Sequence, residues 1–109
     1  MTQAEIQEAL DEMVERIVAR FQPDRIILFG SYAKGQPTSD SDLDFLIVMP
    51  VEGSRRQKAN EIDLALADRA MPIDLIVLTP EQFEREKDLI GTIVCEAARE
   101  GRVIYERAA

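Results

Sequence analysis

The sequence contains no histidine, and its single cysteine is Cys95. The absence of histidine excludes a histidine general base from any reaction that the chain catalyses. One cysteine cannot form an intrachain disulfide, so we expect a reducing compartment and a core position for Cys95. No apolar run approaches the ~20 residues of a membrane-spanning helix, and the N-terminus has no continuous apolar signal region. These absences favour a cytoplasmic protein without membrane association.

Positive charge is also scarce. The chain has 13 lysine and arginine residues against 21 aspartate and glutamate residues, a net charge of -8 at pH 7. Nucleic acid would meet a repulsive field, whereas nucleic-acid-binding proteins present a basic patch or stripe. This balance argues against stable nucleic-acid binding and against polymerase activity on a long nucleic acid.

The chain is short. With 109 residues, we expect one domain spanning 1–109 with a single two-layer core and no additional substrate-binding lobe. No internal repeat, low-complexity tract or linker divides it. The molecule that it modifies must therefore be supplied largely from outside.

Apolar residues follow the helical period in some segments and form short β-branched runs in others. Helices are predicted over 6–21, within 54–70, from Pro80 onwards, and along the apolar stripe 89–98. Strands are predicted over 25–29, 43–49 and 73–78, with a short edge strand at 102–105. Because a helix joins the second and third strands, these two should be parallel. The predicted fold class is α/β: a two-layer fold with a mixed sheet of three core strands and a C-terminal edge strand, covered by helices. Gly101 is expected to adopt the left-handed position after the last helix.

Three aspartates stand at the beginnings of two predicted neighbouring strands. Asp42 and Asp44 are two residues apart, so they share one face of a strand. Asp74 lies one residue inside the third strand, in a run that is otherwise uncharged. Adjacent like charges disfavour folding unless a cation lies between them, and oxygen-only ligands suit Mg²⁺ or Mn²⁺. The pattern predicts a divalent-metal site.

Simpler interpretations exist for each of these residues. Asp74 taken alone could face solvent on a half-exposed strand, and the Asp42/Asp44 pair could belong to a polar turn that enters a strand. The neighbouring Asp40 is expected to be a turn or capping residue. The segment also begins like an EF-hand loop, but it lacks the glycine and glutamate that such a loop requires at its sixth and twelfth positions.

A small-residue turn precedes the aspartates. Gly30 ends the first strand and permits close approach of the backbone, and residues 31–34 resemble one helical turn whose free N–H groups would point toward the carboxylates. The Ser31 hydroxyl can donate to a phosphate oxygen, and Lys34 can add a positive charge. The turn lacks the Gly-Lys-Ser/Thr ending of a P-loop. It is nevertheless suited to a triphosphate.

The stretch from Ile26 to Met49 resembles the nucleotidyltransferase superfamily of the DNA polymerase β type, and most closely its minimal members, the MNT domains. The resemblance implies that an acceptor hydroxyl attacks the α-phosphate of a nucleoside triphosphate and that pyrophosphate leaves. It also implies two Mg²⁺ ions, or Mn²⁺, bridged by Asp42 and Asp44, with Asp74 as a ligand of one ion and acceptor of the hydroxyl proton. Gly30, Ser31 and Lys34 would bind the nucleotide, although the family often has arginine at the last of these positions.

Stand-alone MNT proteins of this length commonly accompany a HEPN-domain toxin and transfer AMP from ATP to one of its tyrosines. The resemblance therefore implies an antitoxin that forms a hetero-oligomer with a HEPN toxin. Two alternatives stay open at this point. One is nucleotidyl transfer to a small molecule such as an aminoglycoside, which usually requires an additional helical domain. The other is a non-catalytic module that neutralises its partner by steric contact and keeps the acidic site for nucleotide sensing.

Overall fold

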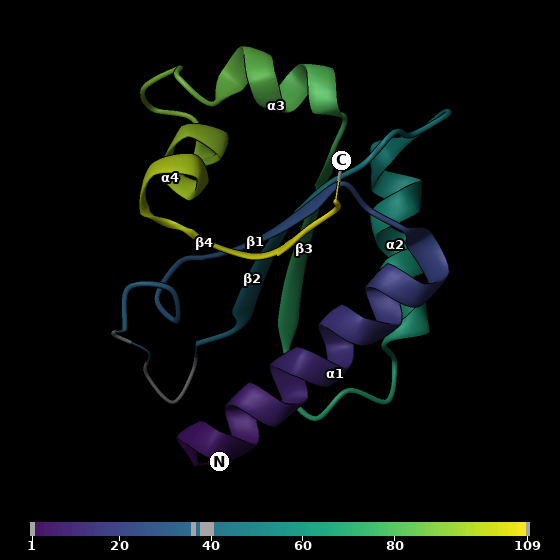
Figure 1. Cartoon of the computed structure of the whole chain (residues 1–109), viewed down its shortest axis with the longest axis vertical. Coiled ribbons are helices and arrows are strands. Elements are labelled where there is room, and N and C mark those ends of the chain that lie inside the picture. Colours follow the sequence, from purple (N-terminus) through teal and green to yellow (C-terminus); the bar gives the residue numbers. More distant parts are fainter. Residues whose placement is uncertain (1, 36, 38–40, 109) are drawn as a thin grey trace.

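Four strands form one sheet in the order β3-β2-β1-β4. The computed structural model describes residues 2–35, 37 and 41–108 (Figure 1). Along the chain the elements are α1 (Gln3–Phe21), β1 (Arg25–Phe29), β2 (Leu43–Val48), α2 (Arg55–Ala65), β3 (Ile73–Leu78), α3 (Pro80–Glu86), α4 (Ile93–Glu100) and β4 (Arg102–Glu106). The predicted bounds of β1 and β3 are confirmed residue for residue, and β2 ends one residue before the predicted Met49.

The sheet is mixed, as predicted. Strand β1 runs antiparallel to both β2 and β4, whereas β2 and β3 are parallel and joined through α2. β4 lies at the edge, where the sequence placed a C-terminal edge strand. The predicted α/β fold class is therefore confirmed. In the parallel pair, Asp44 stands opposite Asp74.

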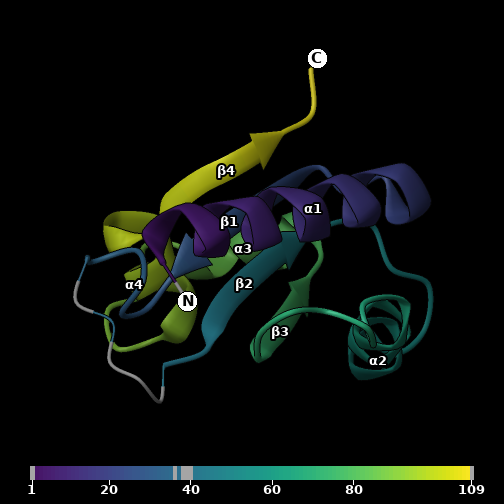
Figure 2. The ribbon, with the colours of Figure 1, turned by 90° about the horizontal axis from the view of Figure 1, so that it is seen from below.

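Alternate residues of the strands point to opposite faces, and each face has its own apolar core. On one face, α1 and α2 pack on residues such as Leu43, Phe45 and Ile47. On the other face, α3 and α4 pack on residues such as Leu46 and Val48. Figure 1 shows the two pairs of helices on opposite sides of the sheet, and Figure 2 shows α1 crossing it. The two-layer description thus holds for α1, α2 and the sheet, to which α3 and α4 add a cover on the second face.

The last helix differs from its prediction. The apolar stripe 89–98 predicted a helix, but α4 begins at Ile93, because the Thr92 side chain accepts a hydrogen bond from the Cys95 N–H and caps the helix there. Leu89 and Ile90 precede this cap, in the connection from α3, and their exposed fractions are 50% and 85%. Local capping chemistry decides the helix start here. Cys95 is buried, as expected.

Gly101 also differs from its prediction. Its backbone is extended (φ -78°, ψ 173°) and not left-handed. A glycine is nevertheless required at this position, because a Cβ would overlap the Ala97 carbonyl oxygen and lie 2.7 Å from Ile27 Cγ2. Close packing of the α4–β4 junction against β1 explains this glycine, and backbone strain does not.

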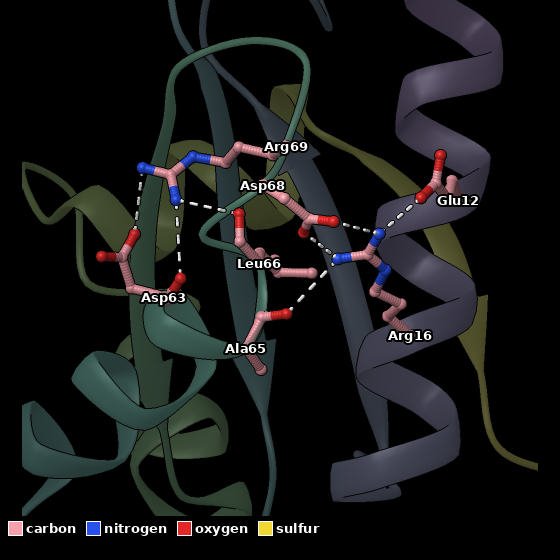
Figure 3. Close-up of polar contacts among 7 residues, drawn as sticks. All are labelled: Glu12, Arg16, Asp63, Ala65, Leu66, Asp68 and Arg69. Carbon is pink, nitrogen blue, oxygen red and sulfur yellow. Dashed lines mark hydrogen bonds and ion pairs between the residues drawn. The ribbon is translucent and has the colours of Figure 1, made fainter.

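An arginine cluster ties α1 to the segment that leads into β3 (Figure 3). Arg16 of α1 donates to both carboxylate oxygens of Asp68, at 2.5 and 3.2 Å, and to Glu12 at 2.6 Å. Arg69 donates to the Leu66 carbonyl at 3.1 Å and pairs with Asp63 at 3.2 Å. These contacts satisfy groups at the C-terminal end of α2 and fix the loop that precedes Asp74.

No helix in the described part of the chain is long and apolar enough to cross a membrane.

Candidate active site

Strands β2 and β3 bring two of the predicted aspartates together. Asp44 and Asp74 are directly opposite in the parallel ladder, so their side chains emerge on the same face of the sheet. That face carries α3 and α4, because Leu43 and Phe45 on either side of Asp44 are buried against α1 and α2. Asp74 is exposed and Asp44 is half-buried. Both lie at the beginnings of their strands.

Asp42 lies close to the same point. It precedes β2 by one residue and is exposed. The pKa of Asp44 is raised by its burial and, to a smaller degree, by the negative charges of Asp74 and Asp42. The charges of Asp74 and Asp42 therefore both act on Asp44. Asp40 lies outside the described residues.

The donor chemistry of this group fits a hard divalent cation. Only carboxylate oxygens are present, and a half-buried carboxylate beside two like charges has a raised pKa, a condition that a cation relieves. In their present positions, no three acidic or cysteine side chains of the described residues are gathered closely enough to hold a metal ion. The residues that would hold one by their chemistry are Asp42, Asp44 and Asp74.

The turn after β1 stands directly against Asp44. Gly30 has a left-handed backbone (φ 77°), and a Cβ on it would overlap the Asp44 Oδ2 oxygen. The neighbouring residue Phe29 pairs with Asp44 across β1 and β2, which explains this proximity. Glycine is therefore required here both for its backbone conformation and for space.

The same turn has the predicted helical geometry. The Lys34 N–H donates to the Gly30 carbonyl at 3.2 Å, and the Gly35 N–H donates to the Tyr32 carbonyl at 3.3 Å. Among the described residues, the backbone N–H groups of Ser31, Tyr32 and Ala33 donate to no backbone carbonyl. These groups lie in the first turn, next to the carboxylates. They are the groups that a phosphate would use.

Lys34 lies in an arrangement that the sequence did not indicate. Its ammonium group pairs with Glu100 at 3.0 Å and with Glu96 at 3.3 Å, both on α4. Hydrogen bonds to Glu100 and then to Glu96 raise the pKa of Lys34. The two glutamates are spaced four residues apart, which places them on one helical face, but nothing in the sequence connects that face with a turn more than sixty residues earlier. The predicted contact of Lys34 with the nucleotide stays a prediction.

A groove of about 680 Å³ elsewhere on the molecule is not associated with these residues. It lies between α1 and β4 and is lined mainly by apolar side chains, among them Leu10, Val14 and Ile104. These three residues belong to the core on the opposite face of the sheet from Asp44 and Asp74. The position of the site is therefore indicated by charge and backbone geometry, and not by the depth of a cavity.

Comparison with protein families identifies the domain type. The model of the nucleotidyltransferase domain matches residues 10–103, which include all six predicted site residues. The chain belongs to the nucleotidyltransferase domain family. The expected resemblance is thereby confirmed, and the α/β fold is the fold of a nucleotidyltransferase domain.

Two proteins of Methanocaldococcus jannaschii, both provisionally named protein adenylyltransferases, are similar to this nucleotidyltransferase domain. One is 34% identical over 104 residues, which cover 91% of this chain and 97% of the relative. The other is 30% identical over 105 residues, which cover 90% of this chain and 70% of the relative. This nucleotidyltransferase is therefore an enzyme whose relatives bear the name of protein-modifying members of the family.

Two solved structures share the fold of this nucleotidyltransferase. A provisionally named nucleotidyltransferase from Sulfolobus solfataricus has a TM-score of 0.69 at 21% identity, with 96% of this chain and 84% of that chain covered. A mutant of the toxin-antitoxin MntA-HpeT has a TM-score of 0.57 at 20% identity, with 89% of this chain and 73% of that chain covered. A toxin–antitoxin protein is thus among the structural neighbours.

Proposed function

We propose that this nucleotidyltransferase transfers AMP from ATP to a tyrosine hydroxyl of a cognate HEPN-family toxin, and that it acts as the antitoxin. In this reaction the hydroxyl oxygen forms a bond to the α-phosphorus, the bond between the α- and β-phosphates breaks, and pyrophosphate leaves. The observation that carries the proposal is the pairing of Asp44 with Asp74 on one face of the sheet, beside the Gly30 turn.

The nucleotide would bind at the turn. Gly30 leaves room for the phosphates next to Asp44, and the N–H groups that begin the turn, together with the Ser31 hydroxyl, would donate to phosphate oxygens. Lys34 would add a positive charge after leaving its partners on α4. Asp74 would accept the proton of an incoming hydroxyl, a role that its exposure supports.

Asp42, Asp44 and Asp74 would hold two Mg²⁺ ions, with Mn²⁺ as a substitute. When bound, such ions neutralise the charge of the triphosphate and lower the pKa of the acceptor hydroxyl. The role of the protein would be to hold these carboxylates near one another in spite of their repulsion. The register of β2 and β3 supports this for Asp44 and Asp74, and Asp42 directly precedes β2. Asp44 fits the centre of such a site because the other two charges already act on it.

The acceptor is proposed from the relatives and the structural neighbour. The curated relatives bear the name of protein adenylyltransferases, and a structural neighbour is a toxin–antitoxin protein. That neighbour is a mutant in which two aspartates, two positions apart, are replaced by glutamate, the same spacing as Asp42 and Asp44. The toxin would supply the acceptor hydroxyl within a cytoplasmic hetero-oligomer.

Intact-mass measurement tests this function. The chain is co-purified with the HEPN-domain product of the neighbouring gene and incubated with ATP and Mg²⁺. We expect the mass of one or more AMP groups on the toxin, located on tyrosine by peptide mapping. Asp42→Ala is expected to abolish this addition while the circular dichroism spectrum of the chain stays unchanged.

The same experiment separates the alternatives. If the Asp42→Ala variant silences the toxin as well as the wild type does, the non-catalytic binding module is the correct interpretation. If the toxin gains no mass but a small hydroxyl compound does, the acceptor is a small molecule.

A further inference from the structure

Two glutamates of α4 hold the only charged side chain of the Gly30–Gly35 turn. The Lys34 ammonium lies 3.0 Å from Glu100 Oε2 and 3.3 Å from Glu96 Oε1. Glu96 and Glu100 are one helical turn apart, and like charges at this spacing destabilise a helix unless a cation lies between them. Lys34 is that cation. The contact therefore joins the turn to α4 and relieves the repulsion within α4.

Lys34 is also the cation of the turn that would bind a nucleotide. Lys34 belongs to the same helical turn as Gly30, whose carbonyl accepts from its N–H at 3.2 Å. Its flexible four-carbon side chain can direct the ammonium to α4 or to the beginning of the turn. A triphosphate bound at the turn would compete with the two glutamates for the same charge.

The contact is accessible enough to be exchanged. The exposed fractions of the side chains are 42% for Lys34, 46% for Glu96 and 56% for Glu100. Ion pairs with this degree of exposure are weak, because water screens them and the long side chains lose entropy on pairing. A phosphate chain with several negative charges can therefore displace the glutamates.

We propose that Glu96 and Glu100 are positioning residues, which hold the Lys34 ammonium on α4 until the triphosphate of the nucleotide takes it from them. This inference rests on the proposed function, since it requires nucleotide binding at the turn. Its consequence is that the α4 carboxylates weaken nucleotide affinity, and they do so through Lys34. Nucleotide binding also releases α4 from its contact with the turn.

Calorimetric titration with a non-transferable α,β-methylene analogue of ATP, in the presence of Mg²⁺, tests the inference without any acceptor. The double variant Glu96→Gln/Glu100→Gln should bind the analogue about threefold to tenfold more tightly than the wild type, as expected for release from two exposed ion pairs. Lys34→Met should bind it more weakly by a similar factor. Added to Lys34→Met, the two glutamine substitutions should have no further effect beyond that of the control.

The matched control is Glu8→Gln/Glu15→Gln, which removes the same two charges from exposed positions on α1, where neither glutamate makes an ion pair with a described residue. Unchanged or weaker binding by the α4 double variant overturns the inference. An equal gain in the presence and absence of Lys34 also overturns it, because the effect would then be one of net charge. If the wild type binds no analogue, the proposed function fails along with it.

Discussion

Gly30 and Asp44 show, at the scale of single residues, how the turn and the carboxylates depend on each other. Gly30→Ala would place a methyl group on the Asp44 carboxylate and force it to move. We expect transfer to fall on the order of a hundredfold, because small displacements of a catalytic group have effects of this size. The left-handed backbone would also cost about 1–2 kcal/mol of stability for an alanine. Labelled-AMP incorporation and thermal unfolding measure the two effects.

Gly35→Ala is the matched control for that substitution. Gly35 lies in the same turn with a similar backbone (φ 71°), but a Cβ there would meet no atom of the described residues within 4 Å. It should lose a similar amount of stability and keep its transfer rate. If both alanine variants lose transfer equally, backbone strain in the turn explains the effect, and the contact with Asp44 does not.

Asp44 should be a source of instability in the absence of metal. Its pKa is raised by burial and by two neighbouring carboxylates, so the folded state favours the protonated form and loses stability as the pH rises through the folded pKa. In buffer containing EDTA at neutral pH, Asp44→Asn should therefore melt at a higher temperature than the wild type. The difference should vanish below the ordinary carboxyl pKa of 3.8.

Addition of Mg²⁺ should reverse this order, because the ion stabilises the wild type and has lost a ligand in the variant. A variant that is less stable than the wild type in EDTA would show that Asp44 is not strained by its neighbours. If Mg²⁺ shifts the melting temperatures of both proteins equally, Asp44 is not a ligand of the metal.

The sequence is sufficient to predict the residues of the site that are local or regularly spaced. Asp42 and Asp44 share a strand face by their spacing alone, and Gly30 closes a strand that is easily recognised. The contact of Lys34 with α4 could not be predicted in this way. It depends on packing between segments that are distant in the chain, and no residue type in the turn signals it.

At the scale of elements, α1 is attached to the loop before β3 by the Arg16 cluster. The hydrogen bond from Arg16 lowers the pKa of Asp68, so this contact contributes stability above the unfolded carboxyl pKa and loses it as the pH falls through the lower folded pKa. Asp68→Asn should accordingly lower the melting temperature at neutral pH, by a small amount because the pair is exposed. The decrease should disappear in acid.

Thermal unfolding of Asp68→Asn and the wild type at neutral and at acidic pH tests this prediction. Asp11→Asn, at an exposed position of α1, serves as the control for loss of one negative charge. A decrease that persists unchanged in acid would mean that the carboxylate charge is not what holds the loop.

The elements that could be predicted are those whose local signals agree with one another. β3 is an apolar run bounded by prolines, and Thr79 with Pro80 gives an unambiguous start to α3. At α4 the signals disagree, since the apolar stripe extends back to Leu89 while Thr92 offers a cap. The cap decides the outcome. The prediction of a left-handed Gly101 is wrong for a related reason, because tight packing and a left-handed turn both select glycine.

At the scale of the whole molecule, the chain carries the proposed catalytic pair Asp44 and Asp74 on one face of the sheet. Its net charge of -8 and its exposed carboxylates favour an acceptor that brings positive charge, within a complex. The parallel pairing of β2 and β3 creates this acidic site, because it brings together two aspartates, Asp44 and Asp74, that are thirty residues apart in sequence.

The most direct test of a catalytic role for the Asp44/Asp74 pair is the rate at which the Asp74→Asn variant transfers labelled AMP to the partner. This variant should lose at least about a hundredfold in rate while its circular dichroism spectrum stays that of the folded chain, whereas the exposed control Asp88→Asn should transfer at the wild-type rate. An Asp74→Asn enzyme as fast as the wild type would contradict the account, since the pairing of Asp44 with Asp74 would then have no part in catalysis.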